Sequence, residues 1–304
     1  MSTNLTQSPS EKKQVSESGP KYLRLAEPEM TVEYLGEQYA LYRVVALRDI
    51  FDTDNRLVAK KGAYGGLVSS DNNLSQKGRC WLDCRSVAFG KSRVVDDATV
   101  INSLVGGEAF VGGSAQVRNN SFIYEKAAVS DRAIVDRSVI RGNAKVIDGA
   151  QVLDGSIIRE RAEIKGHAIC QRAFVSGSAV VCDGARLHFY VKVEDRAKIK
   201  GSAKVYLSQI SGSAIVCDVS QVKYSFLGGD CYVGGIAALI ASKKDTGRFT
   251  SGVTCYSVDD EVNSTDHDAN TAASSESEDS DEPDGSDNPG HGDDAGGIRI
   301  FVFF

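Results

Sequence analysis

The sequence predicts an all-β protein whose central part is a parallel β-helix of short strands joined by tight turns. A small residue followed two positions later by an aliphatic residue recurs at nearly every sixth position from Leu82 to Val233. The few shortened steps all fall at the same corner of a three-row coil, which marks that coil as the repeating unit. Composition agrees, because 304 residues include 30 Gly and only 5 Pro, and 41% of them are hydrophobic. We therefore expect few helices.

The aliphatic position, or its equivalent, defines 27 rows. These rows are Leu82, Ala88, Val94, Val100, Val105, Val111, Val117, Ile123, Val129, Val135, Ile140, Val146, Val152, Ile158, Ile164, Cys170, Val175, Val181, Leu187, Val193, Ile199, Val205, Ile210, Val216, Val222, Leu227 and Val233. The shortened steps follow Val100, Val135, Cys170, Val205 and Val222. With three rows to a triangular coil, the segment supplies about nine coils, and a stacking distance of ~4.8 Å predicts a rod of roughly 43 Å.

Strand geometry explains the spacing, because alternate side chains of a short strand point to the same side. In residues 144–149, Ala144 and Val146 are expected to point to the axis, Lys145 to point outward, and Asp148 with Gly149 to turn the chain. Small residues suit the narrow part of a triangular prism, and β-branched Val and Ile suit the strands.

This pattern resembles the hexapeptide-repeat superfamily of left-handed β-helices, whose best-known members are trimeric acyltransferases. Segments 42–46, 65–68, 73–76 and 80–82 are more specifically similar to the amino-terminal part of YdcK-type bacterial proteins, and the similarity covers about residues 21–233. The resemblance implies a left-handed coil. It also carries an acyltransferase label, for which the cofactor would be a coenzyme A thioester.

The composition changes along the chain and predicts six segments. We expect a disordered N-terminus (1–20), a small N-terminal β cap (21–79), the left-handed β-helix (80–242), a linker (243–258), an acidic disordered tail (259–297) and an apolar C-terminal peptide (298–304). The peptide contains Ile300, Phe301, Phe303 and Phe304, and we expect it to dock by adding a strand to an exposed edge of this chain or of a partner.

Charge is distributed very unevenly. The net charge of -6 arises because residues 259–297 contain 14 acidic residues and no Lys or Arg, whereas the remainder carries 35 basic and 27 acidic residues, about +8. Nucleic acid is not indicated as a partner, because the tail can screen the basic body. Seven cysteines without a C-x-x-C pair predict reduced thiols in a cytoplasmic protein. The sequence shows neither a Sec signal nor a membrane-length apolar run, and export without a signal peptide stays open.

One outward face of the predicted coil is apolar over six consecutive coils, and we call it the apolar stripe. It consists of Val87, Leu104, Phe122, Val139, Ile157 and Phe174. Such a stripe exceeds what soluble monomers usually leave exposed, so it predicts a covered surface. Cover by residues 21–79 or by the C-terminal segment, self-association, and a foreign protein partner remain open.

An enzymatic role would depend on a histidine, since acyltransferases of this superfamily generally use one as a general base. His267 and His291 lie in the acidic tail and His167 is expected to point outward, so His188 beside Phe189 and Tyr190 is the candidate catalytic residue. The six-residue spacing leaves no long loop to close a site, and no motif for a metal or another cofactor is visible. We therefore expect a non-catalytic scaffold or binding protein, with an acyl-CoA-dependent acyltransferase as the alternative.

Overall fold

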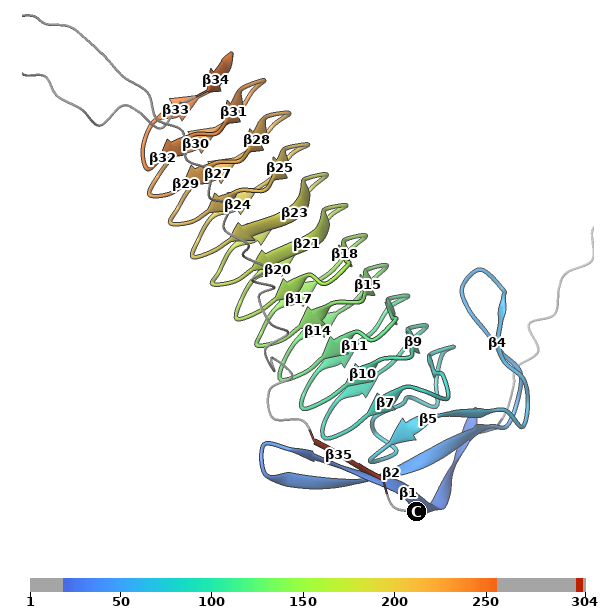
Figure 1. Cartoon of the computed structure of the whole chain (residues 1–304). Coiled ribbons are helices and arrows are strands. Elements are labelled where there is room, and N and C mark those ends of the chain that lie inside the picture. Colours follow the sequence, from blue (N-terminus) through green and yellow to red (C-terminus); the bar gives the residue numbers. More distant parts are fainter. Residues whose placement is uncertain (1–18, 256–298, 303–304) are drawn as a thin grey trace, which may run out of the picture.

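The computed structural model describes residues 19–255 and 299–302. Within them every element is a strand, and the strands form a parallel β-solenoid of about 11 turns, so the predicted fold class of a left-handed parallel β-helix is confirmed. Figure 1 shows a straight rod of stacked coils with a strand hairpin at its N-terminal end. Residues 1–18, the acidic tail 259–297, Phe303 and Phe304 lie outside the described residues.

Five strands precede the regular coils. They are β1 (Tyr22–Tyr34), β2 (Glu37–Ala46), β3 (Ile50–Phe51), β4 (Leu57–Ala59) and β5 (Tyr64–Val68). Strands β1 and β2 form an antiparallel hairpin, and β3 pairs with β4. Strand β5 pairs antiparallel with β2 and parallel with β7, so it joins the hairpin to the first coil.

The coils build three walls, here called A, B and C. Wall A contains β6 (Trp81–Leu82), β9 (Thr99–Ile101), β12 (Gln116–Arg118), β15 (Ile134–Asp136), β18 (Gln151–Leu153), the first parts of β21 (Ile169–Val175) and β23 (Arg186–Val193), β25 (Lys204–Tyr206), β28 (Gln221–Lys223), β31 (Ala238–Ile240) and β34 (Val253–Cys255). Wall B contains β7 (Val87–Ala88), β10 (Leu104–Val105), β13 (Phe122–Ile123), β16 (Val139–Ile140), β19 (Ile157–Ile158), the second parts of β21 and β23, β26 (Gln209–Ile210), β29 (Phe226–Leu227) and β32 (Lys243–Lys244). Wall C contains β8 (Arg93–Val94), β11 (Phe110–Val111), β14 (Ala128–Val129), β17 (Lys145–Val146), β20 (Glu163–Ile164), β22 (Val180–Val181), β24 (Lys198–Ile199), β27 (Ile215–Val216), β30 (Tyr232–Val233) and β33 (Arg248–Phe249).

The core follows the predicted rows. Val146 pairs in register with Ile164, and Ile164 pairs with Val181, all on wall C and all fully buried. Ala144, two residues before Val146, is fully buried as well, whereas Lys145 between them is exposed. The inward pairing of a small and an aliphatic residue is therefore confirmed, and it lets each coil bury apolar area against the coils above and below.

The solenoid is longer at both ends than the expected 80–242. At the C-terminal end, β32, β33 and β34 pair with β29, β30 and β31, so coils continue through residues 243–255, where we expected a linker. At the other end, β5 joins wall B, and an isolated bridge joins Leu74 to Val94 of wall C. The sequence hides the last coil because Lys244 occupies the row position one coil above Leu227, so the apolar signal stops while backbone pairing continues.

The corner between walls C and A is a column of residues with positive φ. The column comprises Asp96, Gly113, Asp131, Asp148, Gly166, Asp183, Gly201, Asp218 and Gly235. A carboxylate accepts a hydrogen bond from the Gly amide of the next coil, as between Asp148 and Gly166 at 2.9 Å and between Asp183 and Gly201 at 3.0 Å. Where an Asp lies one coil below, the corner thus satisfies a backbone donor that the turn leaves without a strand partner.

Candidate functional site

The apolar stripe lies on wall B, where its six residues form one continuous parallel ladder. Leu104 pairs in register with Val87 on one side and with Phe122 on the other. The ladder continues through Val139, Ile157 and Phe174. Beyond Phe174 the ladder continues with Lys192, Gln209 and Phe226. The six apolar residues therefore form a straight row up the rod, as the spacing indicates.

The N-terminal hairpin packs against the lower part of this row. Val32 and Tyr34 of β1 and Leu41 of β2 are 5% exposed or less, and they share a cluster with Phe89 and Leu104. Val87, Phe122 and Val139 pack against the same cluster. The Phe89 ring lies 5.4 Å from Tyr34 and 5.6 Å from Tyr39 between centroids. Part of the predicted cover is therefore the chain's own hairpin.

The upper part of the row lies outside that cluster. Ile157 and Phe174 are half-buried and are not among the residues that pack against the hairpin. The guanidinium carbon of Arg159 lies 4.6 Å from the centre of the Phe174 ring, so a cation covers part of its face. The apolar stripe thus divides into a part beneath the hairpin and a part beyond it.

A strand from the C-terminal peptide pairs with the hairpin. Strand β35 (Arg299–Val302) runs antiparallel to β1, with Val32 opposite Ile300 and Thr31 opposite Phe301. Figure 1 shows β35 beside β1 and β2, at the end of the rod opposite β34. The peptide that we expected to dock by strand addition thus adds a strand to this chain's own sheet.

His188 lies on β23, at the corner between walls A and B, within a column of stacked polar and aromatic side chains. Its Nδ1 lies 3.0 Å from Oε1 of Gln171 one coil below, and Gln171 donates from Nε2 to Asp154 at 2.6 Å. Above it the Tyr206 ring stacks on the imidazole, with a centroid distance of 5.6 Å and an interplanar angle of 22°. The parallel register of β21, β23 and β25 positions all three side chains.

This environment fixes the protonation of His188. An amide oxygen only accepts hydrogen bonds, so Nδ1 donates to Gln171 and Nε2 is the ring's acceptor. Burial, with smaller contributions from Arg186 and Lys204, lowers the pKa of His188 below its ordinary value of 6.5. The imidazole is therefore mostly neutral at pH 7 and able to accept a proton at Nε2.

The groups around His188 hold its imidazole ring in one orientation, but they do not form a proton relay. Asp154 contacts His188 only through the Gln171 amide, which cannot pass a proton as a carboxylate would. The hydrogen bond from Gln171 and the nearby charge of Arg137 hold the pKa of Asp154 below its ordinary range. This carboxylate therefore stays charged. His167 is exposed at another corner, as expected, and His267 and His291 lie outside the described residues.

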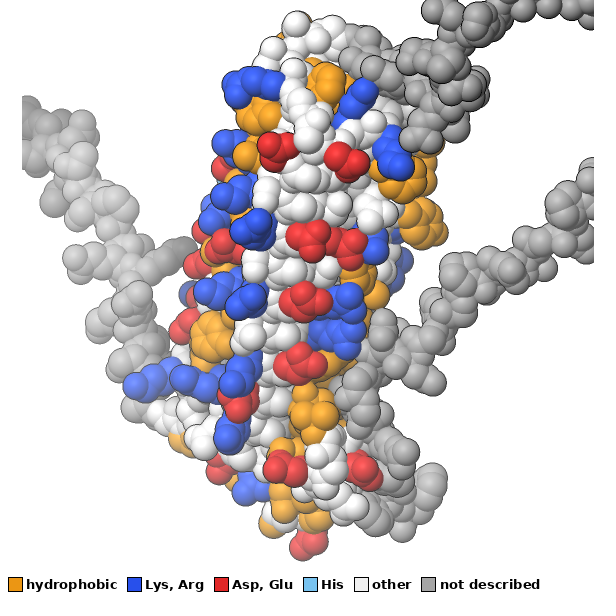
Figure 2. All heavy atoms as spheres, turned by 90° about the vertical axis from the view of Figure 1, so that its left-hand side faces the viewer, with side chains coloured by type: hydrophobic (Ala, Val, Ile, Leu, Met, Phe, Trp, Pro, Cys, Tyr) orange, Lys and Arg blue, Asp and Glu red, His pale blue; other side chains and the backbone are white. Residues whose placement is uncertain are grey.

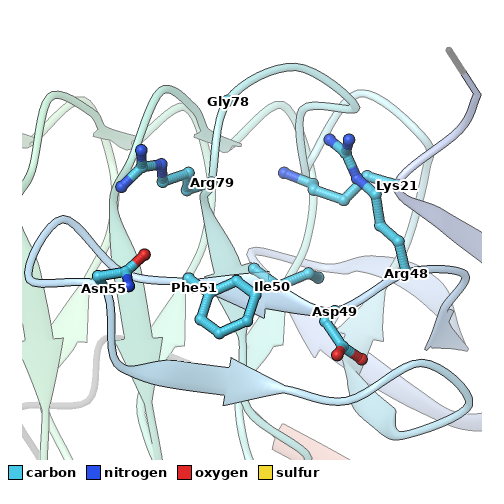
Figure 3. A pocket seen from close by; sticks show the side chains of 8 residues that line it. All are labelled: Lys21, Arg48, Asp49, Ile50, Phe51, Asn55, Gly78 and Arg79. Atoms are coloured by element: carbon cyan, nitrogen blue, oxygen red, sulfur yellow. The ribbon is translucent and has the colours of Figure 1, made fainter. Parts of the chain in front are cut away.

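A separate hollow of about 240 Å³ lies at the base of the rod between β3 and the first coil. Figure 3 shows the cationic side chains of Lys21, Arg48 and Arg79 around it, above Ile50 and Phe51. Lys21 and Arg79 both make hydrogen bonds within the cap and the first coil. Nζ of the buried Lys21 donates to the Cys80 carbonyl at 2.8 Å and lies 3.0 Å from Cys80 Sγ, and Arg79 donates to the Asp52 carbonyl. Burial lowers the pKa of Lys21 and raises that of Cys80. We assign these contacts to stabilisation of the cap.

Sequence inspection missed a surface at the corner between walls A and B. Its exposed residues Phe189, Tyr190, Leu207 and Tyr224 occupy corner positions in three successive coils and have positive φ. The row analysis considered one outward residue per strand and left the corner residues out, so it did not detect this surface. The signal was the large apolar or aromatic residue at the corner position of each of these coils, namely Phe189, Tyr190, Leu207 and Tyr224.

The fold defines the class of this protein: it is a parallel β-solenoid. No family model matches the chain, and no curated protein matches it either. Among the described residues there is no group of three His, Cys, Asp or Glu side chains that could hold a metal ion. The part of the chain that the structure describes also has no helix long and apolar enough to cross a membrane.

Proposed function

We propose that the chain is a non-catalytic β-solenoid scaffold that docks a protein partner, or a second copy of itself, through the apolar stripe. The observation that carries this proposal is the continuation of the stripe past the hairpin. Ile157 and Phe174 stand in register with Val139, but they lie outside the cluster that the hairpin forms with the lower row.

A flat parallel wall favours this use. Side chains one coil apart are ~4.8 Å from each other, so a ladder of apolar residues gives a partner strand or helix a continuous surface. Arg159 and Lys192 both lie near the Phe174 ring, at 4.6 Å and 5.9 Å from its centre, and supply the polar rim that docking surfaces commonly have. The resemblance to the hexapeptide-repeat superfamily points the same way, because oligomers are common there.

The test replaces Ile157 and Phe174 together by Asp and measures particle mass by sedimentation velocity. The matched control replaces Val180 and Ile215, which are half-buried outward residues of wall C, by Asp. We expect the stripe variant to sediment as a smaller particle than wild type and the control to be unchanged. Phe122 is a poor test position because it packs beside the hairpin. A monomeric wild type that captures no partner, with an unchanged stripe variant, would contradict the proposal.

The second candidate is an acyl-CoA-dependent acyltransferase, and the neutral imidazole of His188 favours it. Phe189 lies 6.1 Å from the imidazole between ring centroids, and Arg186 and Lys204 are near enough to lower the pKa of His188. This candidate predicts thermal stabilisation by coenzyme A and acyl transfer to an amine acceptor, both lost in His188→Ala. Stabilisation that survives His188→Ala, without acyl transfer in wild type, would remove it.

A further inference from the structure

The corner between walls A and B carries a cationic and aromatic surface in the coils of β23, β25 and β28. We call it the aromatic corner. It comprises Arg186, His188, Phe189, Tyr190, Lys204, Tyr206, Leu207, Lys223 and Tyr224. Residues 184–190, 202–207 and 219–224, which form this wall and corner, include no Asp or Glu. The surface is therefore positive, and nothing acidic lies within it.

Its cations are available to a ligand. Arg186 and Lys204 are exposed, and neither has a carboxylate partner within salt-bridge distance among the described residues. Nζ of Lys223 lies 5.6 Å from the centre of the Tyr206 ring, and that ring stacks on His188. Exposed cations without acidic neighbours favour a negatively charged polymer. Elsewhere on the rod, Figure 2 shows basic side chains beside a row of acidic ones.

The chain leaves the solenoid in the same column. In the backbone register Tyr206 pairs with Lys223, Lys223 with Ile240, and Ile240 with Cys255, the last described residue of the rod. The chain is described again at Arg299, which pairs with Glu33 of β1 at the opposite end of the rod. The acidic residues 259–297 lie between these two fixed points.

These two points lie about the length of the rod apart. Ten coil spacings of ~4.8 Å give ~48 Å. A flexible chain of the 43 residues from 256 to 298 has a root-mean-square span of ~36 Å. The segment therefore reaches the other end only in a more extended form than its average, beginning at the column that bears the aromatic corner.

We propose that the acidic segment 259–297 docks in cis on the aromatic corner of its own chain. The segment has 14 acidic residues and no Lys or Arg, so its charge complements Arg186, Lys204 and Lys223. Tethering at Cys255 holds it at an effective concentration of about 1 mM near this surface. This inference is independent of the apolar stripe, which lies on the outward face of wall B.

A single-stranded nucleic acid has the same general chemistry, because bases stack on aromatic rings and phosphates pair with Lys and Arg. The tethered segment is the favoured occupant because it starts in this column, whereas an external strand would first have to displace it. Competition by an oligonucleotide is therefore one outcome of the test.

The experiment is zero-length carbodiimide cross-linking of the full chain, followed by mass spectrometry. The reagent joins a carboxylate to a lysine amine that touches it. We expect residues 259–297 to cross-link to Lys204 and Lys223 about fivefold more than to Lys145 and Lys198, which are exposed lysines of wall C. The yield should fall about threefold between 50 mM and 500 mM NaCl, because salt screens exposed pairs.

Two further arms complete the test. The double variant Lys204→Gln and Lys223→Gln is compared with Lys145→Gln and Lys198→Gln, and the reporter is the cross-link from the segment to Lys192 or Lys243 on the adjoining wall. We expect the first variant alone to lower that yield. Equal cross-linking of wall C, or absence of cross-links to the aromatic corner, overturns the proposal. A single-stranded oligonucleotide that binds there without reducing the cross-links overturns it as well.

Discussion

The corner between walls C and A shows how single residues set the shape of the coil. At this corner, residues with φ near +60° are stacked directly on one another, and Asp and Gly alternate over much of the column. The left-handed conformation costs a residue with a Cβ roughly 1–2 kcal/mol. Asp offsets part of this cost by accepting the amide hydrogen bond of the next coil, whereas Gly avoids both the cost and a clash.

Gly166 tests this arrangement. A Cβ at Gly166 would lie 2.8 Å from the backbone nitrogen of Asp183, and its φ is +69°. Gly166→Ala should therefore lower the free energy of unfolding by about 2 kcal/mol or more. Gly184→Ala is the matched control, because Gly184 is close in the chain, is not in the left-handed region and would have no atom nearer than 3.4 Å to its Cβ. Urea denaturation of both variants measures the difference, and equal stability of the two would contradict this account.

At the scale of elements, the hairpin shows where inference from sequence reaches its limit. The rows of the coil were predictable because inward positions such as Val146 and Ile164 repeat with a fixed period and have one environment. Residues 21–79 were recognisable as a β cap, but Val32 and Leu41 give no sign of whether they meet the end of the rod or its side. The hairpin packs where it does because Phe89 projects outward from the coil and contacts it. Gly106 leaves room for the Phe89 ring, since a Cβ at Gly106 would lie 2.4 Å from that ring.

The His188 corner illustrates a second limit. Its sequence neighbours indicated aromatic surroundings, but Gln171 and Tyr206 are 17 and 18 positions away and meet His188 only through the coil register. The neutral imidazole depends on these contacts between coils, so no local motif could reveal it.

Leu41→Ala tests whether the hairpin is a separately stabilised element. Leu41 is fully buried in the cluster that the hairpin forms with the lower part of the apolar stripe. Its truncation should therefore weaken the packing of the hairpin on the rod by about 2–5 kcal/mol. We expect hydrogen exchange to accelerate in β1 and β2 while β12, β15 and β18 keep their protection. Leu57→Ala, on β4 with the side chain 45% exposed, is the control and should change little. Loss of protection along the entire rod would show that the hairpin and the coils unfold as one unit.

At the scale of the whole molecule, the two ends of the rod differ. The N-terminal end bears the hairpin and the small β3–β4 sheet, whereas the last coil carries Lys244 at a row position and Phe249 only half-buried. In a solenoid each coil contacts only its neighbours, so stability is nearly a sum of local terms. Opening should therefore begin at the C-terminal end, where the last coils bury the least apolar area.

Phe249→Ala tests whether local stability declines towards the C-terminal end of the rod. The Phe249 ring packs against the core, with Lys244 Nζ at 5.9 Å from its centre, so its loss removes apolar area from the last coil and should cost about 2 kcal/mol there. Hydrogen exchange followed by mass spectrometry should show protection declining from β24 towards β33 in wild type, and faster exchange of β30 and β31 in the variant. Ile236→Ala, at the same end but 72% exposed, should leave the profile unchanged. Because the coils couple only to their neighbours, β9, β12 and β15 should be unaffected; equal acceleration in those strands would mean that the rod unfolds all at once.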